Sequence, residues 1–146
     1  MHDAGAYGSD LVSDIVGQSR AFTFPKSLYA ERDSIKMVVG NNPDALIVDF
    51  FAGSGTTLHA VNLLNAEDNG NRRCVLVTNN EVANEDAEIL RTKGFKPGDQ
   101  EWESHGICKS VTWPRTTHSI LGRLDDGTSL NLSLIHISEP TRLLSI

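Results

Sequence analysis

The sequence predicts an α/β fold in which parallel strands are flanked by helices, and three observations support this prediction. Residues 45–51 and 73–78 are short, nearly continuous apolar runs, which are typical of parallel strands buried on both faces. A glycine turn at Gly53 and Gly55 follows the first run, and residues 56–64 then carry apolar side chains at helical spacing. Strand, turn, helix and strand in this order predict a βαβ unit with a right-handed crossover.

Further elements are predicted on both sides of this unit. Residues 1–20 are rich in Gly, Ser and Asp and indicate a loop with a short helical piece near residues 11–16. After the extended segment that ends at Pro25, a helix is expected over residues 27–39, stopped by the breakers at 40–43. Asn84 is expected to cap a helix over residues 84–92. Beyond a polar loop at 94–106, residues 107–113 favour one more strand, and 114–131 are weakly patterned.

Composition limits the function classes. The chain has 146 residues, 39% of them hydrophobic and 22% charged, which is the profile of one soluble globular domain. No apolar run approaches the roughly 20 residues that span a bilayer, so no membrane partner and a cytoplasmic location are expected. Cys74 and Cys108 match no zinc or disulfide spacing, so no metal is expected, and Cys74 is interpreted as a core residue. The net charge of −6 argues against a free-standing nucleic-acid binder.

The motif that predicts chemistry is Asp-Phe-Phe-Ala-Gly-Ser-Gly-Thr-Thr at residues 49–57. Its glycines let the chain turn sharply and let a ligand approach without a Cβ clash, and the helix that follows offers free N–H groups. A P-loop would need a Lys after Gly55, and a dinucleotide fingerprint would need a small residue where Leu58 stands. Asp49, just ahead of the turn, favours an S-adenosylmethionine site. A nicotinamide- or flavin-binding fragment and a non-catalytic module stay open as alternatives.

Several motifs resemble one family. Residues 49–57 resemble the S-adenosylmethionine motif of N6-adenine and N4-cytosine DNA methyltransferases. Residues 24–27 resemble the companion motif that precedes it in the β-type permutation of that family. Residues 72–81, 94–99 and 111–115 resemble the modification (Mod) subunits of type III restriction–modification systems. The resemblance covers roughly residues 4–130, and it is specific because these motifs agree in order and spacing.

This resemblance implies a partial Rossmann-like methyltransferase fold that binds S-adenosyl-L-methionine. The family holds the ribose with an acidic residue at the end of the second strand. Here Thr78 or Asn79 stands at that place, and Glu81 is the nearest carboxylate. The cofactor-binding residues that the resemblance implies are Phe24, Pro25, Lys26, Ser27, Asp49, Phe50, Phe51, Ala52, Gly53, Ser54, Gly55, Thr56, Thr57 and Glu81.

No catalytic residue is predicted in this chain. The family's catalytic tetrapeptide is Asp or Asn followed by Pro-Pro and an aromatic residue, and the sequence contains no Pro-Pro pair. In the β-type order that motif precedes residue 1, so residues 1–131 are expected to be a cofactor-binding portion, truncated on the N-terminal side and inactive alone. Residues 132–142 resemble a translated sequencing adapter, residues 143–146 would be read-through, and all of 132–146 is expected to be non-native.

The resemblance also implies what the parent enzyme does. It would methylate double-stranded DNA at a specific site, with adenine N6 as the favoured target, as part of a restriction–modification system. A flipped base would present its amino group to the sulfonium methyl. Double-stranded DNA, bound through the missing part of the parent, a second Mod subunit and a restriction subunit are the expected partners.

Overall fold

The computed structural model describes residues 11–16 and 26–130. The predictions for residues 1–10, 17–25 and 131–146, including Phe24, Pro25 and the adapter-like tail, lie outside the described residues. A helical segment at residues 11–16 comes first. It is followed by α2 (Leu28–Val39), β1 (Leu46–Asp49), α3 (Thr56–Asp68), β2 (Arg73–Leu76), α4 (Asn84–Thr92), α5 (Gln100–Ser104), a π-helix (Cys108–Thr112) and α6 (Trp113–Leu121).

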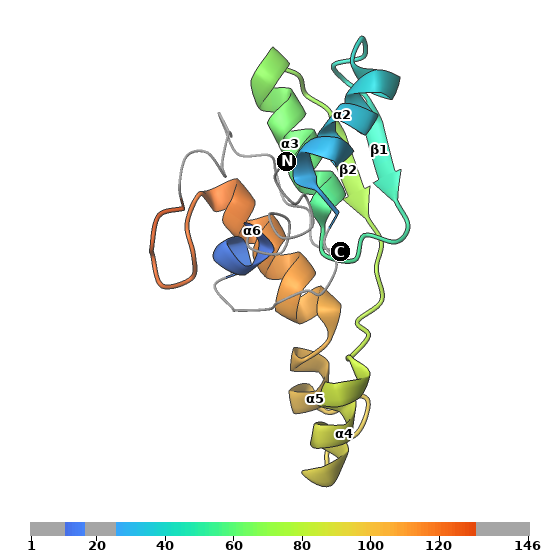
Figure 1. Cartoon of the computed structure of the whole chain (residues 1–146), viewed down its shortest axis with the longest axis vertical. Helices are drawn as coiled ribbons and strands as arrows, with labels where there is room; N and C mark the ends of the chain where they lie inside the picture. The colour runs from blue at the N-terminus through green and yellow to red at the C-terminus, as the bar shows by residue number, and fades with distance from the viewer. Residues whose placement is uncertain (1–10, 17–25, 131–146) are drawn as a thin grey trace, which may run out of the picture.

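The predicted α/β arrangement is confirmed. β1 and β2 pair in parallel, with Leu46 opposite Arg73 and Asp49 opposite Leu76, and α3 connects them. α2 and α3 pack side by side against this two-stranded sheet (Figure 1). α4 spans the predicted residues, although Ala83 rather than Asn84 occupies its cap position. α3 continues four residues past its predicted end, to Asp68.

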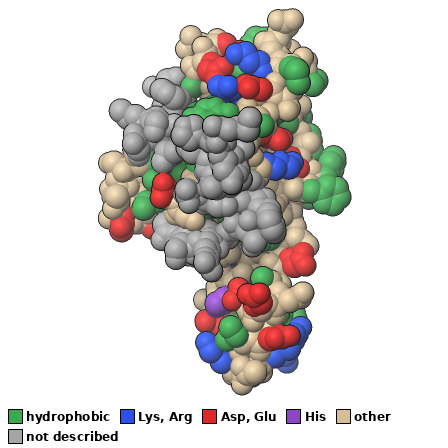
Figure 2. Space-filling model, in the orientation of Figure 1, with side chains coloured by type: hydrophobic (Ala, Val, Ile, Leu, Met, Phe, Trp, Pro, Cys, Tyr) green, Lys and Arg blue, Asp and Glu red, His purple; other side chains and the backbone are tan. Residues whose placement is uncertain are grey.

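The prediction that both strands are buried on both faces is wrong for the described chain. Leu46 is 55% exposed, Val48 44% and Val75 46%, and they alternate with half-buried neighbours. This alternation arises because, among the described residues, helices cover only one face of the sheet (Figure 1). Hydrophobic side chains therefore reach the surface at the β1 margin of the molecule (Figure 2).

The predicted strand at residues 107–113 is also wrong, because these residues form the π-helix that leads into α6. Val111 forms a buried cluster with Val12 and Val16 of the N-terminal helical segment, and Ile107 packs against it. Residues four apart lie on one face of a helix, which is how Ile107 and Val111 reach the same cluster. Pro114 stands in the first turn of α6, where its missing N–H costs nothing.

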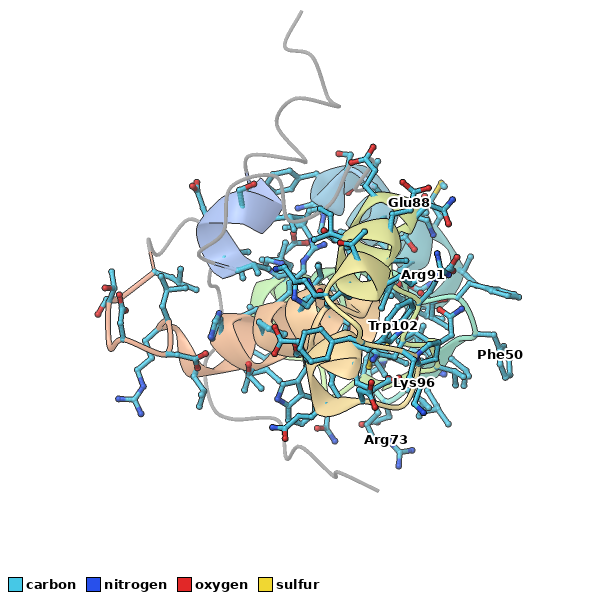
Figure 3. All side chains as sticks on the ribbon, turned by 90° about the horizontal axis from the view of Figure 1, so that it is seen from below. Phe50, Arg73, Glu88, Arg91, Lys96 and Trp102 are labelled. Carbon is cyan, nitrogen blue, oxygen red and sulfur yellow. The ribbon has the colours of Figure 1, made fainter. Side chains whose placement is uncertain are left out.

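The core is divided into clusters. α3 is buried almost all round, and its Ala60 and Leu63 pack against Leu11, Ile15 and Leu28. α4 and α5 have a separate cluster of Ala87, Leu90 and Trp102. This helical pair projects from the βαβ unit (Figure 1), and Arg91 lies over the Trp102 ring, 5.4 Å from its centroid (Figure 3).

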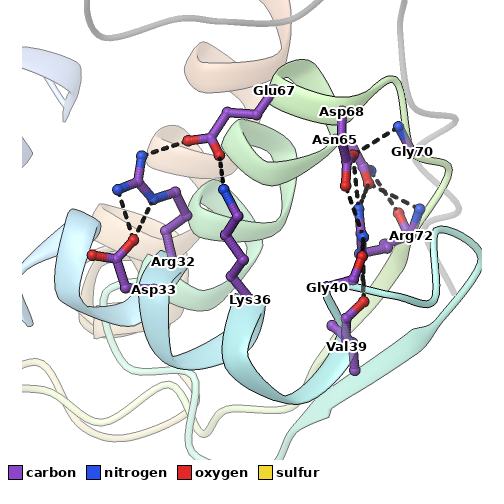
Figure 4. A network of polar contacts seen from close by, with 10 residues as sticks. All are labelled: Arg32, Asp33, Lys36, Val39, Gly40, Asn65, Glu67, Asp68, Gly70 and Arg72. Carbon is purple, nitrogen blue, oxygen red and sulfur yellow. Dashed lines mark hydrogen bonds and ion pairs between the residues drawn. The ribbon is translucent and has the colours of Figure 1, made fainter.

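A buried arginine joins three elements at the end of the sheet opposite the glycine turn (Figure 4). The Arg72 side chain is fully buried, and it donates hydrogen bonds to the carbonyls of Val39 and Gly40 at the end of α2. It also donates to both carboxylate oxygens of Asp68, each at 2.9 Å. The last carbonyls of a helix lack intrahelical partners and favour a nearby cation. Arg72 therefore fixes α2 against α3 and the start of β2.

Cys74 lies in β2, half-buried, and burial raises the pKa of its thiol to about 12, with a smaller contribution from the Asp49 carboxylate. The thiolate is the reactive form, so Cys74 is expected to be a poor nucleophile at neutral pH. In a Cys108→Ser chain at pH 8, we expect iodoacetamide to alkylate Cys74 at least tenfold more slowly than a free cysteine derivative. Unfolding in urea should remove the difference. Equal rates in the folded chain would show that the thiol is not protected.

Candidate cofactor-binding site

The turn between β1 and α3 has a backbone that requires glycine. Gly53 has φ of 49° and Gly55 of 77°, both in the left-handed region. Gly55 is also the N-cap residue of α3, and its N–H donates to the Ala52 carbonyl at 2.8 Å. A Cβ atom at Gly55 would lie 3.4 Å from Cγ2 of Thr112. The turn thus presents the first N–H groups of a 13-residue helix beside the end of β1.

Asp49 organises this turn through its two carboxylate oxygens. Oδ1 accepts a hydrogen bond from the Phe51 N–H at 2.9 Å, and Oδ2 accepts one from the Thr57 hydroxyl at 2.6 Å. The same hydroxyl lies 3.3 Å from Oε1 of Glu31 in α2, and Oε2 of Glu31 lies 3.9 Å from Nζ of Lys26. Through Glu31, these contacts link Lys26, in the described part of the predicted companion motif, to the first turn of α3, and Ser27 is the N-cap residue of α2.

The segment after β2 is tied to residues 103–109. The Asn80 amide donates to the Glu103 carbonyl at 2.8 Å and accepts from the Lys109 N–H at 3.1 Å. The Ile107 N–H donates to the Glu81 carbonyl at 2.9 Å. Gly106 is required here, because a Cβ atom at that position would lie 2.3 Å from the Asn80 side chain. Two segments that are distant in the sequence therefore form one wall beside the ends of the strands.

A pocket of about 930 Å³ lies where the chain leaves β1 and β2. Ligands of parallel α/β sheets bind at this carboxyl end of the strands, and the volume suits a nucleoside-sized ligand. Three carboxylates, Glu81, Glu85 and Asp86, are among the lining side chains, and they suit hydroxyl or cationic groups better than phosphate. The lining residues are Phe50, Phe51, Gly53, Val77, Thr78, Asn79, Glu81, Ala83, Glu85, Asp86, His105, Ile107, Ser110 and Val111.

The residues predicted from the sequence divide into two groups. Phe50, Phe51, Gly53 and Glu81 line the pocket. Lys26 and Ser27 lie at the start of α2, and the others form or support the turn: Asp49, Ala52, Ser54, Gly55, Thr56 and Thr57.

Sequence reasoning missed the wall formed by His105, Ile107, Ser110 and Val111. It assigned those residues to a loop and a strand. The available signal was the four-residue spacing of Ile107 and Val111 ahead of Pro114, which favours a helix.

The back of the turn is held by side chains from the π-helix and α6, which sequence reasoning also missed. The Thr112 hydroxyl donates to the Gly53 carbonyl. Nη1 of Arg115 lies 2.9 Å from Oγ1 of Thr56 and 3.1 Å from Oγ of Ser54. Arg115 is 1% exposed, and burial lowers the pKa of its guanidinium to about 10, which leaves it cationic at neutral pH.

In the described ranges, no helix is long and apolar enough to cross a membrane. Nor do three His, Cys, Asp or Glu side chains gather into a possible metal site within that part of the chain.

The glycine turn and the pocket at the strand ends form one candidate site in an α/β unit, and the comparisons give the class of protein to which the chain is similar. The chain is similar to methyltransferases and modification subunits of restriction–modification systems, so the resemblance predicted from the motifs is confirmed. No protein-family model matches the chain.

Three relatives carry this similarity. The chain is 47% identical over 97 residues to the type II methyltransferase M.KpnI of Klebsiella pneumoniae, which is 65% of this chain and 22% of the relative. It is 34% identical over 93 residues to the type III restriction–modification enzyme StyLTI Mod subunit of Salmonella typhimurium, and this match covers 64% of this chain and 14% of the relative. It is 41% identical over 66 residues to the type III restriction–modification enzyme EcoPI Mod subunit of Escherichia phage P1, and this match covers 45% of this chain and 10% of the relative. The matched segments thus span less than a quarter of each relative.

Proposed function

We propose that this chain is the S-adenosyl-L-methionine-binding part of a site-specific DNA methyltransferase of a restriction–modification system, with adenine N6 as the target. The observation that carries the proposal is the glycine turn, which lines the pocket at the strand ends of a chain 47% identical to a type II methyltransferase. Similarity to two type III Mod subunits favours adenine and supports double-stranded DNA, a second Mod subunit and a restriction subunit as partners of the parent protein.

The residues present fit this cofactor. The N–H groups at the start of α3 suit the carboxylate of its methionine end, since an anion is stabilised at a helix N-terminus. Glu81 suits the ribose hydroxyls, and Ile107 and Val111 offer apolar surface to a flat base. When bound, the cofactor supplies a methyl group on a sulfonium centre. The chain's own residues hold and orient that group, which is a positional contribution to the rate.

We assign the base pocket and the DNA contacts to other parts of the parent protein. Residues 1–131 contain no tetrapeptide of the Asp/Asn-Pro-Pro-aromatic type, and residues 132–146 are proposed to be non-native. The 146-residue chain is therefore expected to bind the cofactor without transferring methyl groups to DNA.

Calorimetric titration of the 146-residue chain with S-adenosylmethionine, S-adenosylhomocysteine and NAD⁺ tests the proposal. We expect binding of the first two and none of NAD⁺. Glu81→Gln should weaken binding about tenfold, or about 1.4 kcal/mol, because the neutral amide oxygen of Gln still accepts a hydrogen bond but a weaker one than the carboxylate accepts. Glu88→Gln is the matched control, because Glu88 is exposed on α4 and absent from the pocket lining (Figure 3). Binding of NAD⁺ alone would favour an oxidoreductase fragment, and binding of none of the three would favour a non-catalytic module.

A further inference from the structure

The Arg115 guanidinium lies behind the glycine turn, on α6, and it is not among the side chains that line the pocket. Its Nη1 contacts the carbonyl of Ser54 at 3.3 Å, the hydroxyl of the same residue and the hydroxyl of Thr56. These are the residues on either side of Gly55, at the N-terminus of α3. A full positive charge therefore lies against the N-terminus of α3, two residues past Gly53, which lines the pocket.

This charge is poorly compensated. Among the described residues, no carboxylate forms an ion pair with Arg115, and its Nε and Nη2 are buried without a hydrogen-bond partner. Burying a charge without a counter-ion costs several kcal/mol by general estimates, so an arrangement that keeps one has a use for it or a partner elsewhere. In a low-dielectric interior such a charge acts over longer distances than at the surface.

The site is therefore electrically polar. Arg115 and the α3 macrodipole place positive charge behind the turn, and the Asp49 carboxylate lies on its β1 side, where it accepts hydrogen bonds from Phe51 and Thr57. Glu81, Glu85 and Asp86 make the wall after β2 negative. A ligand with a carboxylate at one end and hydroxyls or a cationic group towards the other is oriented by this polarity.

We infer that Arg115 is a positioning residue that makes the turn select the carboxylate of an α-amino-acid ligand, the methionine moiety of S-adenosylmethionine. The inference rests on the proposed function. Arg115 acts in two ways: it holds the Ser54 carbonyl in place, and it adds positive charge behind the N–H groups that face the carboxylate. It does not touch the reacting atoms.

Two ligands separate these effects. S-adenosylhomocysteine carries the amino-acid carboxylate, whereas 5′-methylthioadenosine has the same adenosine thioether without the amino acid. In Arg115→Met we expect the affinity for S-adenosylhomocysteine to fall at least tenfold and that for 5′-methylthioadenosine to change less than twofold. Arg115→Lys keeps the positive charge, so it should retain most of the wild-type difference in affinity between S-adenosylhomocysteine and 5′-methylthioadenosine. Thr112→Val is the matched control, because it removes the hydroxyl that contacts the Gly53 and Ile107 carbonyls without changing any charge, and it should affect both ligands equally.

If Arg115→Met lowered the affinity for both ligands equally, the inference would be overturned, and Arg115 would only stabilise the fold. An unchanged affinity for both ligands would overturn it as well. If the wild-type chain binds neither ligand, the proposed function itself fails, which is a different result. If circular dichroism shows that Arg115→Met does not fold, the carboxyl methyl ester of S-adenosylhomocysteine replaces the variant. The wild-type chain should bind this ester at least tenfold more weakly than the free acid, and equal binding would refute the selection of a carboxylate.

Discussion

Replacing Arg72 by Met is expected to lower the free energy of unfolding by about 3 kcal/mol, because it leaves buried polar groups without partners. The substitution keeps most of the side-chain volume and removes the guanidinium. The Gly40 carbonyl then loses the Arg72 donor, the Val39 carbonyl keeps only the Asn42 N–H, and Asp68 loses its ion pair (Figure 4). Urea unfolding followed by circular dichroism measures the change. Arg73→Met is the matched control, since Arg73 is the next residue, is exposed, and should cost less than about 0.5 kcal/mol.

The effect of Arg72 should also depend on pH. The hydrogen bond from Arg72 is the largest cause that holds the pKa of Asp68 below its ordinary value of 3.8. A carboxylate with a lowered folded-state pKa contributes stability above its unfolded pKa, and loses it as pH falls through the folded value. The difference between wild type and Arg72→Met should therefore be constant near pH 7 and shrink below about pH 4. It should not vanish, since the bonds to the α2 carbonyls persist in acid. If wild type and Arg72→Met had nearly the same free energy of unfolding at pH 7, the conclusion that Arg72 stabilises the packing of α2 against α3 would be wrong.

Replacing Gly55 by Val is expected to reduce the affinity for S-adenosylmethionine at least tenfold. At φ of 77° a β-branched residue is strained by roughly 1–3 kcal/mol, and its side chain would press against Thr112. The turn would relax by moving the N–H groups of α3 and the Ser54 carbonyl, which are the groups proposed to hold the methionine end. Calorimetric titration with S-adenosylmethionine and thermal unfolding measure the two effects separately.

Gly98→Val is the matched control for this prediction. Gly98 has φ of 95°, and a Cβ atom there would meet nothing within 4 Å. The control therefore imposes comparable backbone strain far from the turn, and it should lower stability while leaving cofactor affinity unchanged. If Gly55→Val bound the cofactor as tightly as Gly98→Val, the glycine turn would not be the cofactor site.

The sequence by itself determined the elements whose signals are local. The breakers at residues 40–43 end α2 where expected, and the glycine turn separates β1 from α3. The order of the motifs was enough to indicate the family to which the chain is similar. Turn geometry, helix periodicity and helix termination depend on residues within about one or two helical turns, so they can be read from neighbours along the chain.

Only the tertiary structure decided the burial of the strands, the secondary structure of residues 107–113 and the surroundings of Arg115. The apolar run of β1 was compatible with two covered faces, but packing left Leu46 and Val48 exposed. Residues 108–112 form a π-helix against the helical segment at residues 11–16, nearly a hundred positions earlier in the chain. The guanidinium of Arg115 meets Ser54, which lies 61 positions away. A sequence pattern records which side chains are apolar or charged, whereas burial and partnership are set by which distant segments pack together.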